Sequence, residues 1–346
     1  MIRRSRELYS QLADDPPHSG VLKDGTPVTL RANVQPGVPL CGLATFGAEG
    51  IGLYRSEYLW LGEDGSPSEE KQAKVYAEAA RAVAGMGGGS RVVFRALDLG
   101  GDKLMSGTLH HEANPFLGCR SIRWLLAHRD VFRTQLRAIL RASAAGPSAV
   151  MYPMIATRDE LRAANEELAR AKDELRAAGV PFDADIPHGC MVEVPSAALA
   201  ADQLAREADF FSIGTNDLVQ YTLAADRGNE QVAYLYQPAH PAVIKLIDMT
   251  VAAATARGIP VAVCGESAAD PVLAALWIGL GVTSLSMGAS GIPVVKKVLR
   301  GLSSDDVAEL ADKVRAMCAD SSAADVYAFC RAFVLDKVPD FEAFQS

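Results

Sequence analysis

Short apolar runs recur along this chain and alternate with longer stretches of helical pattern. Runs that are apolar at successive positions and bounded by turn residues are typical of parallel strands buried on both faces. Strand–helix alternation around eight such runs favours an α/β fold, a (β/α)8 or TIM barrel, over an open doubly wound sheet. The expected strands are Val28–Asn33, Gly50–Leu53, Arg91–Phe94, Ala149–Pro153, Gly189–Val194, Phe210–Ile213, Val261–Cys264 and Ser284–Met287.

Helical patterns fill most of the intervals between these runs. Residues 66–69, Ser-Pro-Ser-Glu, have the form of a capping box with proline at the first helical position, and they predict a helix that runs to about Ala84. Further helices are expected at Asp159–Ala178, from Pro195 onward, at Ser304–Val314 and at Ala323–Phe333.

A boundary between two parts of the chain is expected near its N-terminus. Residues 1–13 have the spacing of a short helix, which the prolines at 16 and 17 break. Beyond residue 20 no composition shift marks a further boundary. We therefore expect an N-terminal helical linker over residues 1–20, and one barrel domain with C-terminal closing helices over residues 21–346.

Polar residues with catalytic potential follow directly after several of the expected strands. The carboxyl ends of barrel strands lie on one face, where the active sites of such barrels are built from several loops. We therefore expect these side chains to lie around one site. The residues are Arg55, Arg95, Glu193, Asn216, Asp217 and Cys264, with Arg227 further along the sixth loop.

Two carboxylates, Glu193 and Asp217, suggest a metal site. A pair of carboxylates whose remaining positions are filled by water and substrate oxygens suits Mg²⁺, which is rarely held by protein ligands alone. The alternative is that each carboxylate caps the helix that follows it.

Arginines form a second group of candidates. Arg55, Arg95 and Arg227 are the main ones, and Arg120 and Lys103 are weaker. Because the guanidinium fork matches phosphate and carboxylate oxygens, several arginines at one barrel mouth imply a small and highly anionic substrate. The alternative for any single arginine is an ordinary surface position.

Cys264 is the third kind of candidate, since it ends the seventh expected strand and is followed by a polar turn. Buried cysteine is more often an inert core residue, so both roles stay open on this basis alone. The six cysteines form no CxxC pair, which argues against a zinc ribbon or a dithiol redox site and fits a reducing cytosol.

Bulk properties narrow the range of functions. The formal net charge of −8 argues against a nucleic-acid surface, which needs a basic footprint. No apolar run is long enough to span a bilayer, and the N-terminus lacks the apolar core of a signal peptide. We expect a cytoplasmic protein with no membrane insertion.

The segments around the candidate residues resemble the C-terminal phosphoenolpyruvate-binding domain of enzyme I of the bacterial sugar phosphotransferase system, a phosphoenolpyruvate–protein phosphotransferase. The resemblance runs from about Val28 to Arg300. Pyruvate phosphate dikinase and phosphoenolpyruvate synthase are more distant relatives. The matching segments read GIGLYRSEYLW, RALDLGGDK, NPFLGCRSIR, MYPMI, MVEVPSAAL, DFFSIGTNDLVQYTLAADRGN and VCGESAADP.

The resemblance implies a set of roles, residue by residue. Asn216 and Arg227 would contact the phosphate of phosphoenolpyruvate, Glu193 and Asp217 would hold Mg²⁺, and Cys264 would protonate the enolate to give pyruvate. The substrate-binding residues would be Arg55, Arg95, Asn216, Asp217 and Arg227.

The resemblance also implies partners. The phosphoryl group would pass to a histidine on another domain, in cis or in trans, and from there to a small phosphocarrier protein, and the barrel would form a homodimer. That family carries the histidine in a Gly-Gly-x-Thr-Ser-His setting, which this sequence does not contain, so we expect a fragment or a truncated homologue. Two alternatives stay open: a module that senses phosphoenolpyruvate or pyruvate without turnover, and a Mg²⁺-dependent lyase or aldolase on the same barrel.

Overall fold

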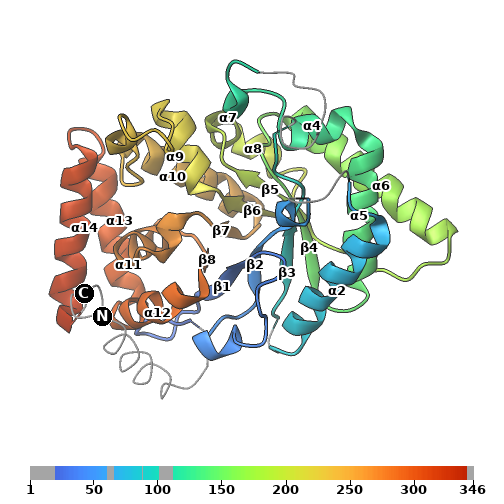
Figure 1. The fold of residues 1–346 in the computed structure, drawn as a ribbon. Helices are drawn as coiled ribbons and strands as arrows, with labels where there is room; N and C mark the ends of the chain where they lie inside the picture. Colours follow the sequence, from blue (N-terminus) through green and yellow to red (C-terminus); the bar gives the residue numbers. More distant parts are fainter. Residues whose placement is uncertain (1–19, 61–65, 88, 101–111, 341–346) are drawn as a thin grey trace.

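The structure, a computed structural model, describes residues 20–60, 66–87, 89–100 and 112–340. In this part of the chain eight parallel strands close into a barrel in sequence order, and β8 pairs with β1 (Figure 1). This arrangement confirms the (β/α)8 prediction, and each strand lies within two residues of its expected bounds. The strands are β1 (Thr29–Val34), β2 (Ile51–Arg55), β3 (Val92–Arg95), β4 (Ser148–Tyr152), β5 (His188–Val192), β6 (Phe210–Ile213), β7 (Val261–Val263) and β8 (Ser284–Met287).

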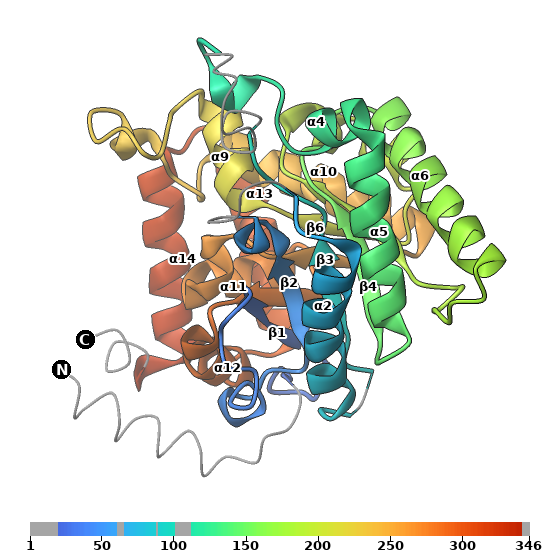
Figure 2. The ribbon, with the colours of Figure 1, turned by 45° about the vertical axis from the view of Figure 1, so that its right-hand side comes forward.

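Helices surround the barrel on its outside (Figures 1 and 2). Helices α2, α5 and α6 lie side by side on one flank, and α13 and α14 form a second layer outside α11 on another. The helices expected after residue 20 are all found among the described residues. The helices are α2 (Glu69–Ala84), α4 (Ile122–Ala127), α5 (Arg129–Ser143), α6 (Arg158–Ala177), α7 (Pro195–Leu199), α8 (Ala201–Leu204), α9 (Thr215–Leu223), α10 (Pro241–Arg257), α11 (Pro271–Gly279), α12 (Ile292–Gly301), α13 (Ser304–Met317) and α14 (Ala323–Lys337).

The start of α2 corrects one detail of the sequence analysis. Ser66 was expected to cap this helix, with Pro67 as its first residue, but the helix begins at Glu69 and Ser68 is the cap. The Ser68 hydroxyl accepts the Lys71 N–H at 3.2 Å. The Pro67 carbonyl accepts a side-chain N–H of Gln72, which lies inside the helix, at 2.8 Å.

The two faces of the strands have different neighbours. Tyr54 of β2 and Phe94 of β3 pack against Tyr76 of α2 outside the barrel, with ring centroids 5.9 and 5.0 Å from that of Tyr76. Because successive side chains of a strand point to opposite faces, Leu53 and Val93 point inward. The buried inner layer consists of Leu53, Val93, Ala149, Met151, Met191 and Cys264.

Some expectations concern residues outside the described part of the chain. The helix over residues 1–13 lies there, and so does Lys103. The division into a linker and a barrel is therefore not tested by the structure. None of the helices in the described ranges has the length and apolar character needed to cross a membrane.

Candidate active site

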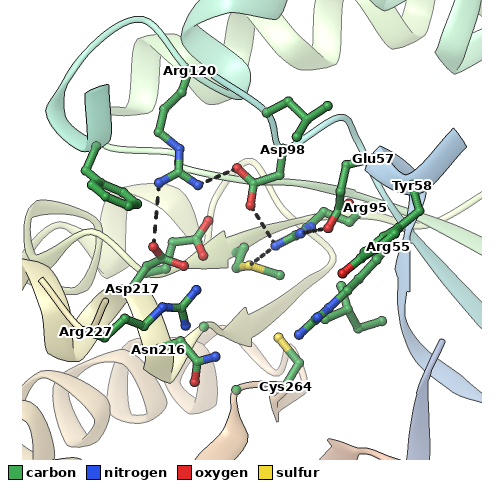
Figure 3. A pocket seen from close by; sticks show the side chains of 17 residues that line it. Arg55, Glu57, Tyr58, Arg95, Asp98, Arg120, Asn216, Asp217, Arg227 and Cys264 are labelled. Carbon is green, nitrogen blue, oxygen red and sulfur yellow. Dashed lines mark hydrogen bonds and ion pairs between the residues drawn. The ribbon is translucent and has the colours of Figure 1, made fainter. Parts of the chain in front are cut away.

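A cavity of about 350 Å³ opens at the carboxyl ends of the strands. All seven residues that the sequence analysis assigned to a site line this cavity, and Arg120 lines it too (Figure 3). The strand-end positions therefore converge as expected, since parallel strands bring their carboxyl ends to one face. The residues are Arg55, Arg95, Glu193, Asn216, Asp217, Arg227 and Cys264.

Arg95 is fixed in this cavity by two carboxylates. Its guanidinium donates to Glu57 Oε1 at 2.5 Å and pairs with Asp98 Oδ2 at 3.0 Å. Only 9% of the Arg95 side chain is exposed. Burial raises the pKa of Glu57, although Arg95 opposes the shift. The pairing holds the arginine in one position beside the cavity.

Asp98 links Arg95 to a second arginine. Its Oδ1 accepts from Arg120 at 2.9 Å, and Arg120 also reaches Asp217 Oδ1 at 3.7 Å (Figure 3). Burial alone would raise the pKa of Asp98, but the two guanidinium groups outweigh it and hold the pKa below the ordinary value. Tyr221 on α9 accepts a hydrogen bond from Arg120 at 3.3 Å, which joins the loop after β3 to the helix that carries Asp217.

Glu193 and Asp217 are buried carboxylates, 1% and 8% exposed. Burial and the charge of Asp217 raise the pKa of Glu193 well above its ordinary value, and burial and Asp98 raise that of Asp217. Burial is the largest cause of both shifts, and a neighbouring carboxylate is the second. Among the described residues no cluster of three or more His, Cys, Asp or Glu side chains forms a ready metal cage, so a metal here would need ligands from solvent or substrate.

Strained backbone supports two of the carboxylates. Met154, with φ 57°, donates its N–H to Glu193 Oε1 at 2.7 Å, and Ser121, with φ 54°, donates its hydroxyl to Asp98. Non-glycine residues in this region cost on the order of 1–3 kcal/mol each and cluster at functional sites. Gly214 lies so close to Glu193 that a Cβ there would come within 2.7 Å of its Oε2, so this position needs glycine.

Asn216 is held by residues from two other loops. Its Nδ2 donates to Glu266 Oε1 at 3.2 Å, and its Oδ1 accepts from Tyr236 at 3.1 Å and from the Glu266 N–H at 2.9 Å. Arg227, by contrast, is exposed, although its backbone N–H donates to Gln220 Oε1 at 3.3 Å. The two expected phosphate contacts therefore differ in rigidity.

Cys264 lies at the inner end of the cavity and is 3% exposed. Its thiol is 3.7 Å from the carbonyl oxygen of Ile213. Burial raises the pKa of Cys264 to about 11, although Arg95 and Arg55 oppose the shift. Figure 3 shows the guanidinium of Arg55 directed toward this thiol. At neutral pH the thiol therefore keeps its proton.

Several lining residues received no role from the sequence. Glu57 and Asp98 stand two and three residues after Arg55 and Arg95, and this placement after β2 and β3 was the available signal. Tyr58 directly follows Glu57 and carries the same signal, whereas Phe116, which also lines the cavity, carries none. The sequence could not show that Glu57 and Asp98 pair with the same arginine, because that requires the spacing of the strands.

Comparisons with known proteins show which sequences this chain is similar to. A family model of the PEP-binding domain of PEP-utilising enzymes matches residues 10–304. A phosphoenolpyruvate-protein phosphotransferase from Staphylococcus aureus is 46% identical over 294 residues, 85% of this chain and 51% of the relative. One from Priestia megaterium is 45% identical over 313 residues, 90% of this chain and 53% of the relative. The chain thus spans about half the length of the curated relatives it matches.

Likeness to solved structures is weaker. A citrate lyase beta subunit from M. tuberculosis, complexed with oxaloacetate and magnesium, has 16% sequence identity and a TM-score of 0.41, covering 79% of this chain and 97% of that chain. This likeness is too distant to bear on function. The sequence relatives confirm the resemblance to phosphoenolpyruvate-protein phosphotransferases, and the chain belongs to the family of PEP-binding domains of PEP-utilising enzymes.

Proposed function

We propose that this chain is the phosphoenolpyruvate-binding catalytic part of a phosphoenolpyruvate–protein phosphotransferase. It activates phosphoenolpyruvate for phosphoryl transfer to a histidine on another domain, in cis or in trans, and releases pyruvate. The observation that carries the proposal is the cavity that combines four arginines, four carboxylates and a protonated thiol. Such a set suits a small anion that must lose a phosphoryl group and gain a proton.

The arginines and Asn216 are assigned to substrate binding. Arg55 and Arg95 bind phosphoenolpyruvate, and Asn216 and Arg227 contact its phosphate. Phosphoryl transfer needs little covalent help from the protein, so positioning and charge neutralisation dominate. The fixed pairing of Arg95 with Glu57 and Asp98 supports a positioning role.

Glu193 and Asp217 are the proposed Mg²⁺ ligands, and Asp217 also belongs to the substrate-binding set. The residues fit a divalent cation because two buried carboxylates line the same cavity, and Mg²⁺ is commonly bound through one or two carboxylates plus substrate oxygens. When bound, the ion supplies positive charge to the oxygens of the substrate.

The step balances once another domain supplies the acceptor histidine. The bond between phosphorus and the bridging oxygen breaks, phosphorus bonds to a nitrogen of the acceptor histidine, and the enolate of pyruvate is left. Its methylene carbon then takes the proton of the Cys264 thiol. A thiol whose pKa burial raises to about 11 is protonated throughout the neutral range and is available as this acid.

The remaining expectations belong to the same proposal. The partners are phosphoenolpyruvate, a phosphohistidine domain and, through it, a small phosphocarrier protein of sugar transport. The chain forms a homodimer in the cytoplasm through its barrel, and residues 1–20 form a linker to the barrel of residues 21–346. A credible dimer interface would bury about 1,000 Å² or more.

Reconstitution tests the proposal. The chain is incubated with phosphoenolpyruvate, Mg²⁺, a separately prepared phosphohistidine domain and a phosphocarrier, and pyruvate release is measured. We expect pyruvate only when all components are present, and a large loss in the Arg227→Ala variant. Equal pyruvate release without the histidine domain would contradict the proposal. Carbon–carbon cleavage of 2-oxo acids would instead indicate a lyase or aldolase, and binding without any turnover would indicate a sensor.

A further inference from the structure

The residues that directly precede the two carboxylates of the Arg95 pair contact one and the same side chain. Glu57 directly follows Ser56, and Asp98 directly follows Leu97. Both Ser56 and Leu97 are contacted by the same side chain, which lies outside the barrel and lines none of the described cavities. That side chain is Gln135 on α5.

Gln135 uses both ends of its amide. Its Oε1 accepts the backbone N–H of Leu97 at 2.9 Å, and its Nε2 donates to the Ser56 hydroxyl at 2.9 Å. Ser56 in turn donates to the carbonyl oxygen of Arg95 at 2.7 Å. Gln135 therefore contacts the residue before each of the two carboxylates that hold Arg95. Through Ser56 it is also linked to the backbone carbonyl of Arg95.

The orientation of this amide is determined by its partners. A backbone N–H can only donate, so the amide atom that faces Leu97 has to be the oxygen. The nitrogen must then face Ser56 and the Tyr76 hydroxyl, which is 3.2 Å away. Gln135 and Ser56 are both 0% exposed, so water does not replace these bonds when the amide is removed, and each group left without a partner costs free energy.

We infer that Gln135 is a positioning residue for Arg95, which acts by fixing the strand ends that carry Arg95, Glu57 and Asp98. Without the amide, the turns after β2 and β3 lose their common anchor. The two carboxylates then no longer hold the Arg95 guanidinium in one place. The role in substrate binding rests on the proposed function, whereas the effect on the position of Arg95 does not.

The chain offers a matched control for the experiment. Gln72 on α2 is also a glutamine with 0% exposure, and it belongs to the same buried network, since its Oε1 accepts from Tyr76 at 3.2 Å and its Nε2 donates to the Pro67 carbonyl at 2.8 Å. The hydrogen bonds to Ser56 and Leu97 belong to Gln135 and not to Gln72. Gln135→Met and Gln72→Met remove the same amide from similar surroundings, so loss of a buried hydrogen-bonding group is common to both.

Two readouts are measured on the whole chain with Mg²⁺ present. The first is the dissociation constant of phosphoenolpyruvate, with the thermal midpoint of unfolding recorded as a measure of stability. The second is the Nε–H resonance of Arg95 in a ¹⁵N spectrum without substrate, assigned with an Arg95→Lys variant. We expect both glutamine variants to lower the thermal midpoint, but only Gln135→Met to weaken binding about tenfold or more and to shift or broaden the Arg95 resonance.

Equal effects of the two variants on binding and on the Arg95 resonance would overturn the inference, and so would an unchanged Arg95 resonance in Gln135→Met. If Gln135→Met does not fold, Ser56→Ala removes one half of the link, and it should move the same two readouts in the same direction. If the unaltered chain does not bind phosphoenolpyruvate, the proposed function fails, and the Arg95 resonance still decides the role of Gln135.

Discussion

Arg95 and Arg227 line the same cavity but differ in how much of the structure depends on them. Arg95 is buried between Glu57 and Asp98, whereas Arg227 is exposed. Removing one member of a buried ion pair typically costs about 3–5 kcal/mol, because the partner is left without compensation. We expect Arg95→Ala to lower the free energy of unfolding in urea by that order, and Arg227→Ala to leave it nearly unchanged.

Arg227→Ala tests whether this exposed arginine contributes to binding and not to stability. Arg227→Ala should weaken phosphoenolpyruvate binding at full stability, as measured by calorimetry. A stable Arg95→Ala variant would show that Glu57 and Asp98 do not depend on this arginine. A loss of stability in Arg227→Ala would show that this exposed side chain has a structural role.

Cys264 allows binding to be separated from proton transfer. Cys264→Ala leaves the arginines and the carboxylates in place, so we expect phosphoenolpyruvate to bind within a few-fold of the unaltered chain. Proton delivery to the methylene carbon should be lost. In the reverse sense, exchange of pyruvate methyl hydrogens with solvent deuterium should stop. Normal exchange in Cys264→Ala would make the thiol a core residue without a role in the reaction.

The same residue predicts a dependence of stability on pH. Burial raises the pKa of Cys264 from 9.0 to about 11. The contribution of the buried thiol to the free energy of unfolding is therefore fully present below pH 9 and is lost as the pH rises toward 11. In that range the unfolded chain releases the proton while the folded chain keeps it, a difference of about 2–3 kcal/mol at most. Thermal midpoints between pH 8 and 10.5 should fall more steeply for the unaltered chain than for Cys264→Ala.

At the scale of elements, the barrel could be predicted because each strand carries its own local signal. A short apolar run such as Phe210–Ile213 is recognisable without knowing its neighbours. The start of α2 was misplaced by two residues because Ser66 and Ser68 are both good caps by residue type, and the structure shows that the Ser68 hydroxyl accepts the capping N–H of Lys71. Contacts between elements, such as those of Gln135, have no local signal.

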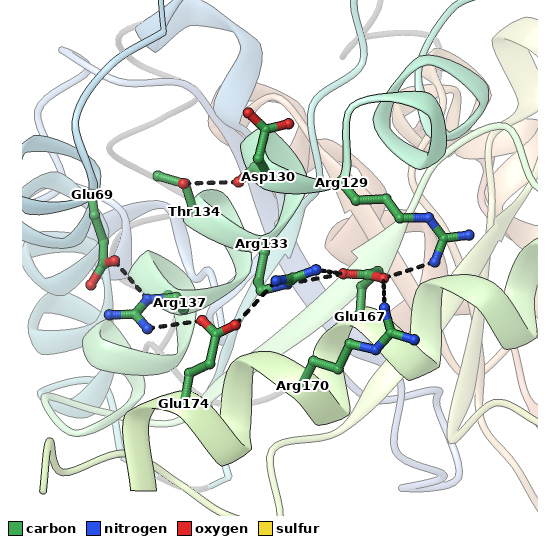
Figure 4. Close-up of polar contacts among 9 residues, drawn as sticks. All are labelled: Glu69, Arg129, Asp130, Arg133, Thr134, Arg137, Glu167, Arg170 and Glu174. Atoms are coloured by element: carbon green, nitrogen blue, oxygen red, sulfur yellow. Dashed lines mark hydrogen bonds and ion pairs between the residues drawn. The ribbon is translucent and has the colours of Figure 1, made fainter. Parts of the chain in front are cut away.

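Charged residues also join α5 to its neighbours (Figure 4). Glu167 on α6 has a fully buried side chain and pairs with Arg129, Arg133 and Arg170 at 2.8–3.0 Å. Two turns further on, Glu174 pairs with Arg133 and Arg137 but is 39% exposed. The sequence of α6, rich in Glu and Arg, predicts the helix but not which carboxylate is buried.

This difference predicts unequal effects of one substitution. Glu167→Gln should lower the free energy of unfolding by about 1–3 kcal/mol, because charged hydrogen bonds in a buried position are lost. Glu174→Gln, the matched control, should cost less than about 1 kcal/mol, as exposed pairs do. Urea unfolding of both variants is the measurement. Equal costs would show that burial does not decide the strength of these pairs.

At the scale of the whole molecule, the net charge gave little guidance about the site. The chain carries −8, yet the described residues that line the cavity include four arginines and four carboxylates, which makes the cavity formally neutral. The lining residues with charge are Arg55, Glu57, Arg95, Asp98, Arg120, Glu193, Asp217 and Arg227. An anion as highly charged as phosphoenolpyruvate would therefore bring excess negative charge into the site.

This balance predicts that substrate binding depends on a divalent cation. We expect EDTA to weaken phosphoenolpyruvate binding to the isolated chain by about tenfold or more, or about 1.4 kcal/mol, as measured by calorimetry against the same chain in Mg²⁺. Glu193→Gln keeps the shape of the site but removes a proposed ligand, so its affinity should be alike with and without Mg²⁺. Because burial and Asp217 raise the pKa of Glu193, protons compete with the metal at a higher pH than for an ordinary carboxylate. The effect of Mg²⁺ on phosphoenolpyruvate binding should therefore shrink as the pH falls. An unaltered chain that binds equally well in EDTA would show that Glu193 and Asp217 have another role.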